Sequence, residues 1–147
     1  MTICSFSGGC ALAVLAWSAI IGGSAWASEL IPPGLYDVTT QTSMPHLEEN
    51  LRYATTRETR CLAHQELSTA FPVLAHPSLE GCRLTAGNRS QDEISYLLVC
   101  AGRHGTTGDA LWRVSGNPIV GTLRVKLGGK NMTFSQRVTA KFLGQCD

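Results

Sequence analysis

The first 27 residues contain no Lys, Arg, Asp or Glu, so all 12 basic and all 11 acidic residues of this 147-residue chain follow them. The apolar run Ala11–Ile21 lies within this uncharged segment, and Ala25-Trp26-Ala27 follows it. The run is short for a membrane span, and two small residues separated by one other residue are typical of a signal-peptide cleavage site. We therefore predict a secretory signal peptide over residues 1–27 and one domain over residues 28–147.

The same segment lacks the Lys or Arg that usually precedes the apolar run of a signal peptide. An uncleaved membrane anchor and a misassigned start codon therefore stay open as alternatives. Cys10 precedes the apolar run, whereas a cysteine that receives a lipid would follow it. We expect a periplasmic or secreted protein that is not inserted in the membrane after cleavage.

The part that follows residue 27 has no block or stripe of basic residues, and the formal net charge of the chain is +1. Proteins that bind nucleic acid usually gather Lys and Arg on one surface to neutralise phosphates. Nucleic acid is therefore a poor candidate for the partner.

No Cys-x-x-Cys pair occurs, although the chain contains six cysteines. The four that follow residue 27 are Cys61, Cys82, Cys100 and Cys146. Closely spaced ligand pairs are typical of zinc sites, whereas an even number of widely spaced cysteines in an exported chain is typical of disulfides. We predict two disulfides, and we expect no metal and no cofactor.

The residues from Cys82 to Cys100 have the pattern of a β-hairpin. Folding about Gln91 makes three cross-strand pairs, which are Cys82–Cys100, Leu84–Leu98 and Ala86–Tyr96. Side chains alternate along a strand, so this register places all six on one face and brings the two sulfurs together. The polar run Gly87–Glu93 supplies the loop. The hairpin therefore predicts a disulfide between Cys82 and Cys100.

Alternation of apolar and polar residues predicts five further strands. They are Gly34–Thr42, Arg52–Cys61, Asp109–Ser115, Ile119–Leu127 and Met132–Phe142. The charges of the second of these indicate an edge or a solvent-facing strand. Leu62–Phe71 has the spacing of a helix, and Pro72 ends it. The large side chains expected inside are Leu84, Tyr96, Leu98, Trp112, Leu123, Val125, Phe134, Val138 and Phe142.

Strand direction decides the second disulfide, because a plain meander would leave Cys61 and Cys146 at opposite ends of the sheet. If Leu62–Gly81 is a crossover that returns the chain to the end where the second strand began, the second and third strands run parallel. The first and last strands are then antiparallel, and Cys61 and Cys146 lie at one end. We therefore predict a disulfide between Cys61 and Cys146. The expected fold is mainly β, a single antiparallel curved sheet or small partly closed barrel of about seven strands with one short helix.

Short motifs follow one another in a recognisable order along the chain. They are Pro33-Gly-Leu-Tyr-Asp-Val-Thr39, Met44-Pro45, Arg60-Cys-Leu62, Gly81-Cys82, Leu98-Val-Cys100, Val120-Gly-Thr122 and Leu143-Gly-Gln-Cys146. This set resembles the domain-of-unknown-function 3617 family of small exported bacterial proteins with four cysteines. The resemblance implies an envelope location. It implies no activity, because the family has none assigned to it.

Motifs that concentrate catalytic groups are absent. There is no Gly-x-Ser-x-Gly element, and the loop Gly102–Gly108 lacks the Lys-Ser/Thr ending of a phosphate loop. Asp92 and Glu93 lie at a hairpin tip, where solvated turn residues are common. The histidines, which form no dense ligand motif, are His46, His64, His76 and His104. We expect no enzyme and no catalytic residue; an unrecognised hydrolase stays open as a less favoured alternative, because the members of a triad meet only in space.

Large apolar side chains of the later strands suggest what the fold is for. Tyr96, Trp112 and Phe134 are expected to face one interior, and small barrels can enclose one small ligand. The first hypothesis is therefore a non-catalytic binding module that holds a small apolar or amphipathic ligand against these three residues. The alternative is a structural or protein-interaction component of the cell envelope that fills its own interior. The volume and lining of any internal pocket distinguish the two.

Overall fold

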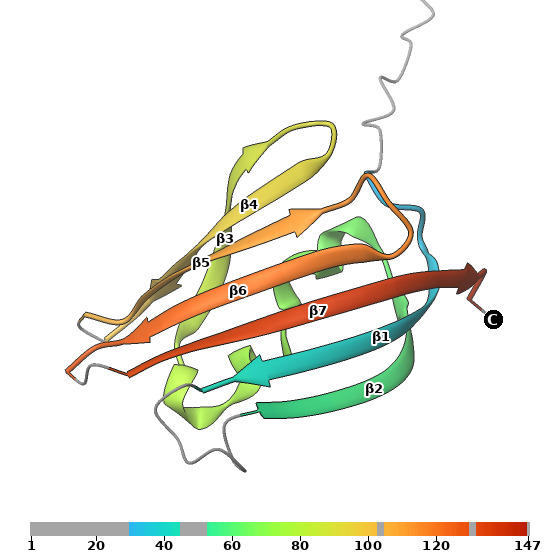
Figure 1. Ribbon diagram of the computed structural model, residues 1–147. Helices are drawn as coiled ribbons and strands as arrows, with labels where there is room; N and C mark the ends of the chain where they lie inside the picture. The colour runs from blue at the N-terminus through green and yellow to red at the C-terminus, as the bar shows by residue number, and fades with distance from the viewer. Residues whose placement is uncertain (1–29, 45–52, 103–104, 130–131, 147) are drawn as a thin grey trace, which may run out of the picture.

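The computed structural model describes residues 30–44, 53–102, 105–129 and 132–146, and the predicted signal peptide lies outside these ranges. Their strands are β1 (Gly34–Ser43), β2 (Tyr53–Leu62), β3 (Cys82–Arg89), β4 (Glu93–Cys100), β5 (Thr107–Arg113), β6 (Ile119–Leu127) and β7 (Met132–Gly144). All seven form one antiparallel sheet in the order β2-β1-β7-β6-β5-β4-β3 (Figure 1). The prediction of a mainly β fold with a single curved sheet is confirmed.

One face of the sheet is apolar because hydrophobic residues recur at every second position of the strands. In β6, Leu123 and Val125 are buried, whereas Arg124 and Lys126 between and after them are exposed. Of the nine large side chains expected inside, eight are buried, and Phe142 is half-buried. We call the apolar side the inner face and the other side the outer face.

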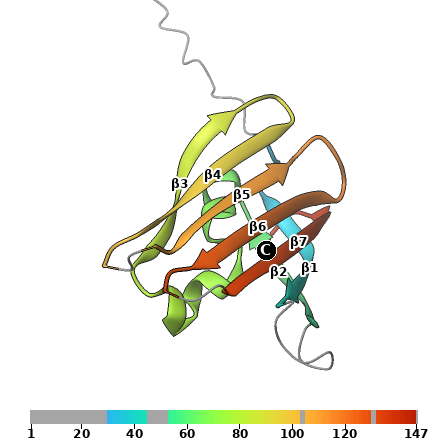
Figure 2. The ribbon, with the colours of Figure 1, turned by 60° about the vertical axis from the view of Figure 1, so that its left-hand side comes forward.

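The chain between β2 and β3, residues 63–81, crosses the inner face and forms three short 3₁₀ helices. They are η1 (His64–Thr69), η2 (Pro72–Ala75) and η3 (Pro77–Leu79). Figure 2 shows them within the curve of the sheet. We call this segment the crossover. Among the described residues, no helix is long and apolar enough to span a membrane.

The short helix expected over Leu62–Phe71 has a different type and different bounds. Leu62 is the last residue of β2, and the helix is the six-residue η1. Pro72 and Pro77 lack the backbone N–H that a continuing α-helix needs, so the segment breaks into three short helices. Leu67 and Ala70 are both buried and lie three residues apart, which matches the three residues per turn of a 3₁₀ helix.

The sheet does not close, although its first and last strands pair. β1 and β7 run antiparallel from Leu35↔Gly144 to Ser43↔Ser135, as the strand-direction argument predicted. The edges are β2 and β3, and the antiparallel steps between them leave both running in the same direction. The crossover lies between these edges in place of a further strand. Most of β2 is exposed, which confirms its expected place at an edge.

The two disulfides join the cysteines that the strand arguments paired. Cys82 and Cys100 are directly opposite in the β3–β4 ladder, and Cys61 on β2 bonds Cys146 beyond the end of β7. β1 lies between β2 and β7 in the sheet, so the second disulfide spans it. With loops of 18 and 85 residues, the chain-entropy estimates are about 3 and about 4.5 kcal/mol. Bonds of this kind are typical of proteins that fold in a non-reducing compartment.

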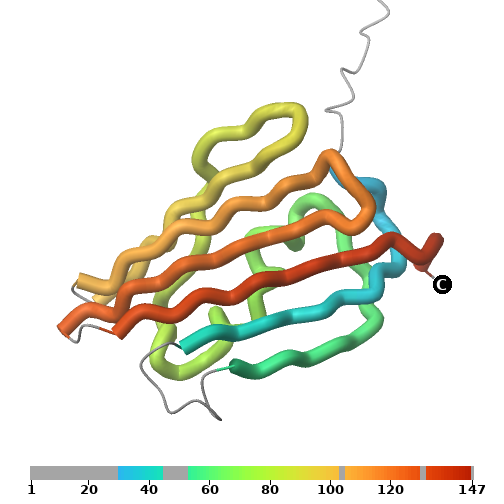
Figure 3. The backbone as a smooth tube through the Cα atoms, in the orientation of Figure 1, coloured from blue at the N-terminus to red at the C-terminus, as the bar shows by residue number. Residues whose placement is uncertain are grey.

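The β3–β4 hairpin is longer than the sequence predicted, because β3 continues to Arg89 and the loop shortens to residues 90–92. The tip projects beyond the neighbouring strands (Figure 3). Its register shifts after Ala86. There the Ser95 hydroxyl accepts a hydrogen bond from Asn88 N at 2.8 Å and donates one to Asn88 O at 3.1 Å, replacing ladder bonds. Ala86 shares the predicted face but is exposed, because the tip extends past the core.

Trp112 is the centre of the packing between the sheet and the crossover. Its side chain is 0% exposed, and its indole Nε1 donates a hydrogen bond to Leu67 O of η1 at 3.1 Å. The Phe71 ring lies 5.4 Å from the Trp112 ring, between centroids. Gly121 of β6 lies opposite Trp112, and a Cβ built there would lie 2.6 Å from Trp112 Cε2. The ring therefore occupies the space that a side chain at position 121 would need.

Gly121→Ala is expected to destabilise the protein by about 1 to 3 kcal/mol, because the added methyl group overpacks the Trp112 ring. Chemical denaturation of the purified domain measures the change. Gly116→Ala is the matched control, because its nearest contact, Pro118 O, is 3.4 Å from the added atom. A free energy of unfolding that is equal in the two variants would contradict the packing described for Trp112.

Candidate functional site

The three aromatic residues that the sequence assigned to a ligand all lie on the inner face. Tyr96 is on β4, Trp112 on β5 and Phe134 on β7, and each belongs to a different one of three successive inward-facing rows that run across the strands. Their exposed fractions are 7%, 0% and 8%. Burial raises the pKa of the Tyr96 phenol. The crossover covers Trp112, so a ligand contacts this ring only if the crossover moves.

A hollow of about 610 Å³ opens between the two edges of the sheet. Its lining residues are Glu58, Arg60, Ser68, Thr69, Phe71, Pro72, Leu74, Ala75, Cys82, Arg83 and Leu84. They belong to β2, the crossover and β3, so the hollow follows the unpaired side of the sheet. We call it the seam groove. It combines an apolar wall of Phe71, Leu74 and Leu84 with the cationic side chains of Arg60 and Arg83.

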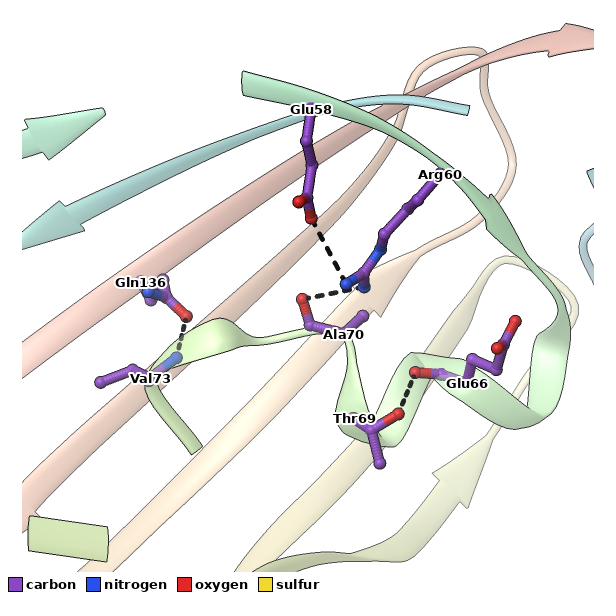
Figure 4. A network of polar contacts seen from close by, with 7 residues as sticks. All are labelled: Glu58, Arg60, Glu66, Thr69, Ala70, Val73 and Gln136. Atoms are coloured by element: carbon purple, nitrogen blue, oxygen red, sulfur yellow. Dashed lines mark hydrogen bonds and ion pairs between the residues drawn. The ribbon is translucent and has the colours of Figure 1, made fainter. Parts of the chain in front are cut away.

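The Arg60 guanidinium of the seam groove contacts Ala70 and Glu58 (Figure 4). Its Nη2 donates a long hydrogen bond of 3.4 Å to Ala70 O, and its Nη1 lies 3.5 Å from Glu58 Oε1. Its Nε is buried and has no hydrogen-bond partner among the described residues. A buried N–H without a partner costs free energy, so this guanidinium favours an additional acceptor.

Gln136 fixes the crossover to the sheet, and the sequence analysis missed it. It is 3% exposed on the inner face of β7. Its Oε1 accepts from Val73 N at 3.2 Å, and its Nε2 donates to Thr42 Oγ1 at 2.8 Å (Figure 4). Both ends of the buried amide are therefore bonded. The sequence feature that identifies Gln136 as an inward residue is its position, because alternation along β7 places it on the inner face between Phe134 and Val138.

The described histidines that were considered for catalysis belong to no metal-binding cluster. His46 and His104 lie outside the described residues. His64 is half-buried in η1, and the Nδ1 of exposed His76 accepts a hydrogen bond from Ser78 N at 3.1 Å. Within the described part of the chain, no group of three or more His, Cys, Asp or Glu could hold a metal ion.

The outer face is polar, and its described residues form three ion pairs between neighbouring strands. They are Arg57–Asp37, Arg113–Glu93 and Arg124–Asp109. The hairpin-tip carboxylate of Glu93 is therefore paired, while Asp92 contributes its backbone oxygen to Val114 N. Hydrogen bonds from the Arg57 guanidinium hold the pKa of the Asp37 carboxyl below its usual value. Exposed pairs of this kind orient side chains more than they stabilise the fold.

Comparison with known proteins finds one family. The model of a family described as "Protein of unknown function (DUF3617)" matches residues 31–146. No curated protein and no solved structure matches this chain significantly.

Arg57→Ala is expected to raise the pKa of the Asp37 carboxyl toward its ordinary value, because the hydrogen bonds that favour the carboxylate are lost. A depressed folded-state pKa adds stability above the unfolded-state pKa, and this stability disappears as pH falls through the folded-state pKa. The variant should therefore lose less stability than the parent protein on acidification below about pH 4. A carboxyl-detected NMR titration measures the pKa, with Arg137→Ala as control. An unchanged Asp37 pKa in Arg57→Ala would contradict the assignment of the shift to this pair.

Proposed function

This chain belongs to the DUF3617 family, and from that premise we propose that it is an exported, non-catalytic binding module that holds a small amphipathic anion in the seam groove. Small-molecule sites are usually concave and mainly apolar, with a few polar groups that fix the orientation of the ligand. The seam groove has this composition. An apolar tail would lie along Phe71, Leu74 and Leu84, and an acidic head would meet Arg60.

The observation that carries the proposal is the weakly held Arg60 guanidinium, which is 31% exposed beside the apolar wall of the seam groove and whose Nη groups make long contacts of 3.4 Å and 3.5 Å. A carboxylate or phosphate accepts two parallel N–H bonds from one guanidinium, so an acidic head can bind these N–H groups more strongly than Ala70 O and Glu58 do. Glu58 approaches the same guanidinium only through Nη1, and its side chain is 54% exposed. Glu58 therefore weakens anion binding without filling the site.

The proposal gives the inner-face aromatic residues a second role. Phe71 lines the seam groove and also packs against Trp112, so a ligand that displaces Phe71 changes the surroundings of the indole. Tyr96 and Trp112 would then be secondary contacts, and Trp112 is reached only when the crossover moves. Phe134 lines a different hollow, of about 580 Å³. Because Trp17 and Trp26 lie in the predicted signal peptide, Trp112 is the only tryptophan of the mature chain.

Arg60→Ala is expected to lower the affinity for laurate about tenfold, because the acidic head loses its charge-assisted hydrogen bonds. Glu58→Gln should raise the affinity, since it removes the competing carboxylate. Trp112 fluorescence, checked by calorimetry, measures the binding. Arg57→Ala is the matched control, because Arg57 lies on the same strand but on the outer face.

Two results would contradict the site. One is the absence of any heat or emission change on addition of laurate or of lipid extracts. The other is an equal loss of affinity in Arg57→Ala and Arg60→Ala, which would indicate a general charge effect. Turnover of an ester, peptide or glycoside that disappears when a single Ser, His or Asp is changed would replace the binding module with an enzyme.

Export rests on the apolar run Ala11–Ile21, on Ala25-Trp26-Ala27 behind it and on the two disulfides. The mature protein is expected to begin at Ser28 and to occur in the envelope fraction with Cys61–Cys146 and Cys82–Cys100 oxidised. Mass spectrometry of the intact protein and non-reducing peptide mapping measure both. An intact Met1 terminus on a cytoplasmic protein with free thiols would contradict export.

The second candidate function is a structural or interaction component of the envelope that binds another protein through β2. This strand is ten residues long, mostly exposed, and pairs only with β1 among the described strands. An unpaired edge can accept an extended segment of a partner as a further strand. Constant Trp112 emission across the ligand panel, together with a protein partner whose binding is lost in a Thr59→Pro variant, would favour this function.

A further inference from the structure

The outer face carries more basic than acidic side chains. The outward positions of β1, β2 and β4 to β7 hold six basic residues, which are Arg57, Arg113, Arg124, Lys126, Arg137 and Lys141. The same positions hold three acidic residues, Asp37, Glu93 and Asp109, and each forms an ion pair with one arginine. Lys126, Arg137 and Lys141 are therefore left without an ion pair among the described residues. This charge excess favours a negatively charged partner.

A hollow of about 400 Å³ lies among the arginines of this face. Arg113 of β5, Arg124 of β6 and Arg137 of β7 line it, so each of three neighbouring strands contributes one guanidinium. Its floor includes Leu111 and Val120. Leu111, Thr122 and Arg137 lie opposite one another in one row of the sheet, which places Arg137 beside the apolar floor. We call this hollow the arginine hollow.

We propose that the arginine hollow binds a phosphate group. A phosphate offers several oxygens to the planar N–H forks of arginine, and three guanidiniums around one hollow match it better than they match a carboxylate with two oxygens. Arg113 uses only its Nε for Glu93, and Arg124 uses Nε and Nη2 for Asp109. Both keep further N–H groups for a ligand, and Arg137 keeps all of its own.

The apolar floor and the ion pairs both affect the strength of this site. Leu111 and Val120 exclude water from one side of the hollow, which strengthens hydrogen bonds formed above them. Asp109 lines the hollow as well and holds the Arg124 guanidinium at 2.9 Å. Its charge opposes an incoming phosphate, so the site is expected to be moderate in affinity and sensitive to salt.

This inference goes beyond the proposed function and does not depend on it. Arg60 points to the inner side of β2, whereas Arg137 points outward from β7. The seam groove and the arginine hollow have no lining residue in common. An experiment that contradicts binding at one site therefore does not affect the proposal for the other.

Titration of the isotope-labelled mature protein with pyrophosphate at low salt, followed by amide NMR, tests the site. Saturable shifts are expected in β5, β6 and β7 around Arg137. Arg137→Gln should weaken the binding about tenfold, and Asp109→Asn should strengthen it, because Arg124 is released. The matched control is Lys141→Gln, which removes the same charge from the same face and strand but lies outside the arginine hollow. No saturable shift, or an equal loss in Arg137→Gln and Lys141→Gln, would overturn the proposal.

A second experiment distinguishes a phosphate on a lipid from a phosphate on a soluble molecule. The parent protein and Arg137→Gln are sedimented with phosphatidylcholine vesicles that contain phosphatidylglycerol, and glycerol phosphate is titrated in parallel. Sedimentation that depends on Arg137 assigns the group to a lipid headgroup. Binding of glycerol phosphate without sedimentation assigns it to a soluble phosphate ester, and failure of both arms would contradict a phosphate site.

Discussion

The direction of the two edge strands is the constraint on which the rest of this structure depends. Seven strands joined by antiparallel ladders end with β2 and β3 running the same way, so the ladder that builds the sheet cannot continue between them. The chain reaches β3 from the end of β2 only by returning along the sheet. That return is the crossover, which covers Trp112 on one side and borders the seam groove on the other. The packing around Trp112 and the seam groove therefore both result from the crossover between the two edge strands.

The alternation of apolar and polar residues predicted most of this fold, because it reflects the local geometry of each strand. The pairing of Cys82 with Cys100 follows from one register of a hairpin, and β6 begins and ends where its alternation does. The turns of the crossover were not predicted in detail, since prolines and burial against the sheet override the helical spacing of Leu62–Phe71. Gln136 was missed for a related reason: a polar residue at an inward position is explained only by partners distant in the sequence, Thr42 and Val73.

The candidate sites were less predictable than the fold. The inward direction of Tyr96, Trp112 and Phe134 could be predicted from periodicity, but the covering of Trp112 by Leu67 and Phe71 could not. The seam groove joins residues of β2, the crossover and β3, so it exists only once the edges have been placed. The basic character of the outer face was present in the sequence but spread over separate strands. A net charge of +1 gave no indication of it, because acidic residues elsewhere in the chain balance the excess.

The disulfide between Cys61 and Cys146 determines how the protein responds to force along its chain. It closes a covalent loop over a separation of 85 residues, and this loop contains the crossover and the strands from β3 to β7. Tension applied between the two ends of the domain passes directly from Cys61 to Cys146 and bypasses that loop. Only β1 and β2 carry load, so stretching peels them from β7 and exposes the Tyr36 and Val38 side chains that β1 contributes to the core. A protein tethered at its ends in this way would extend by a fixed length, because the disulfide keeps the crossover and β3 to β7 within the covalent loop.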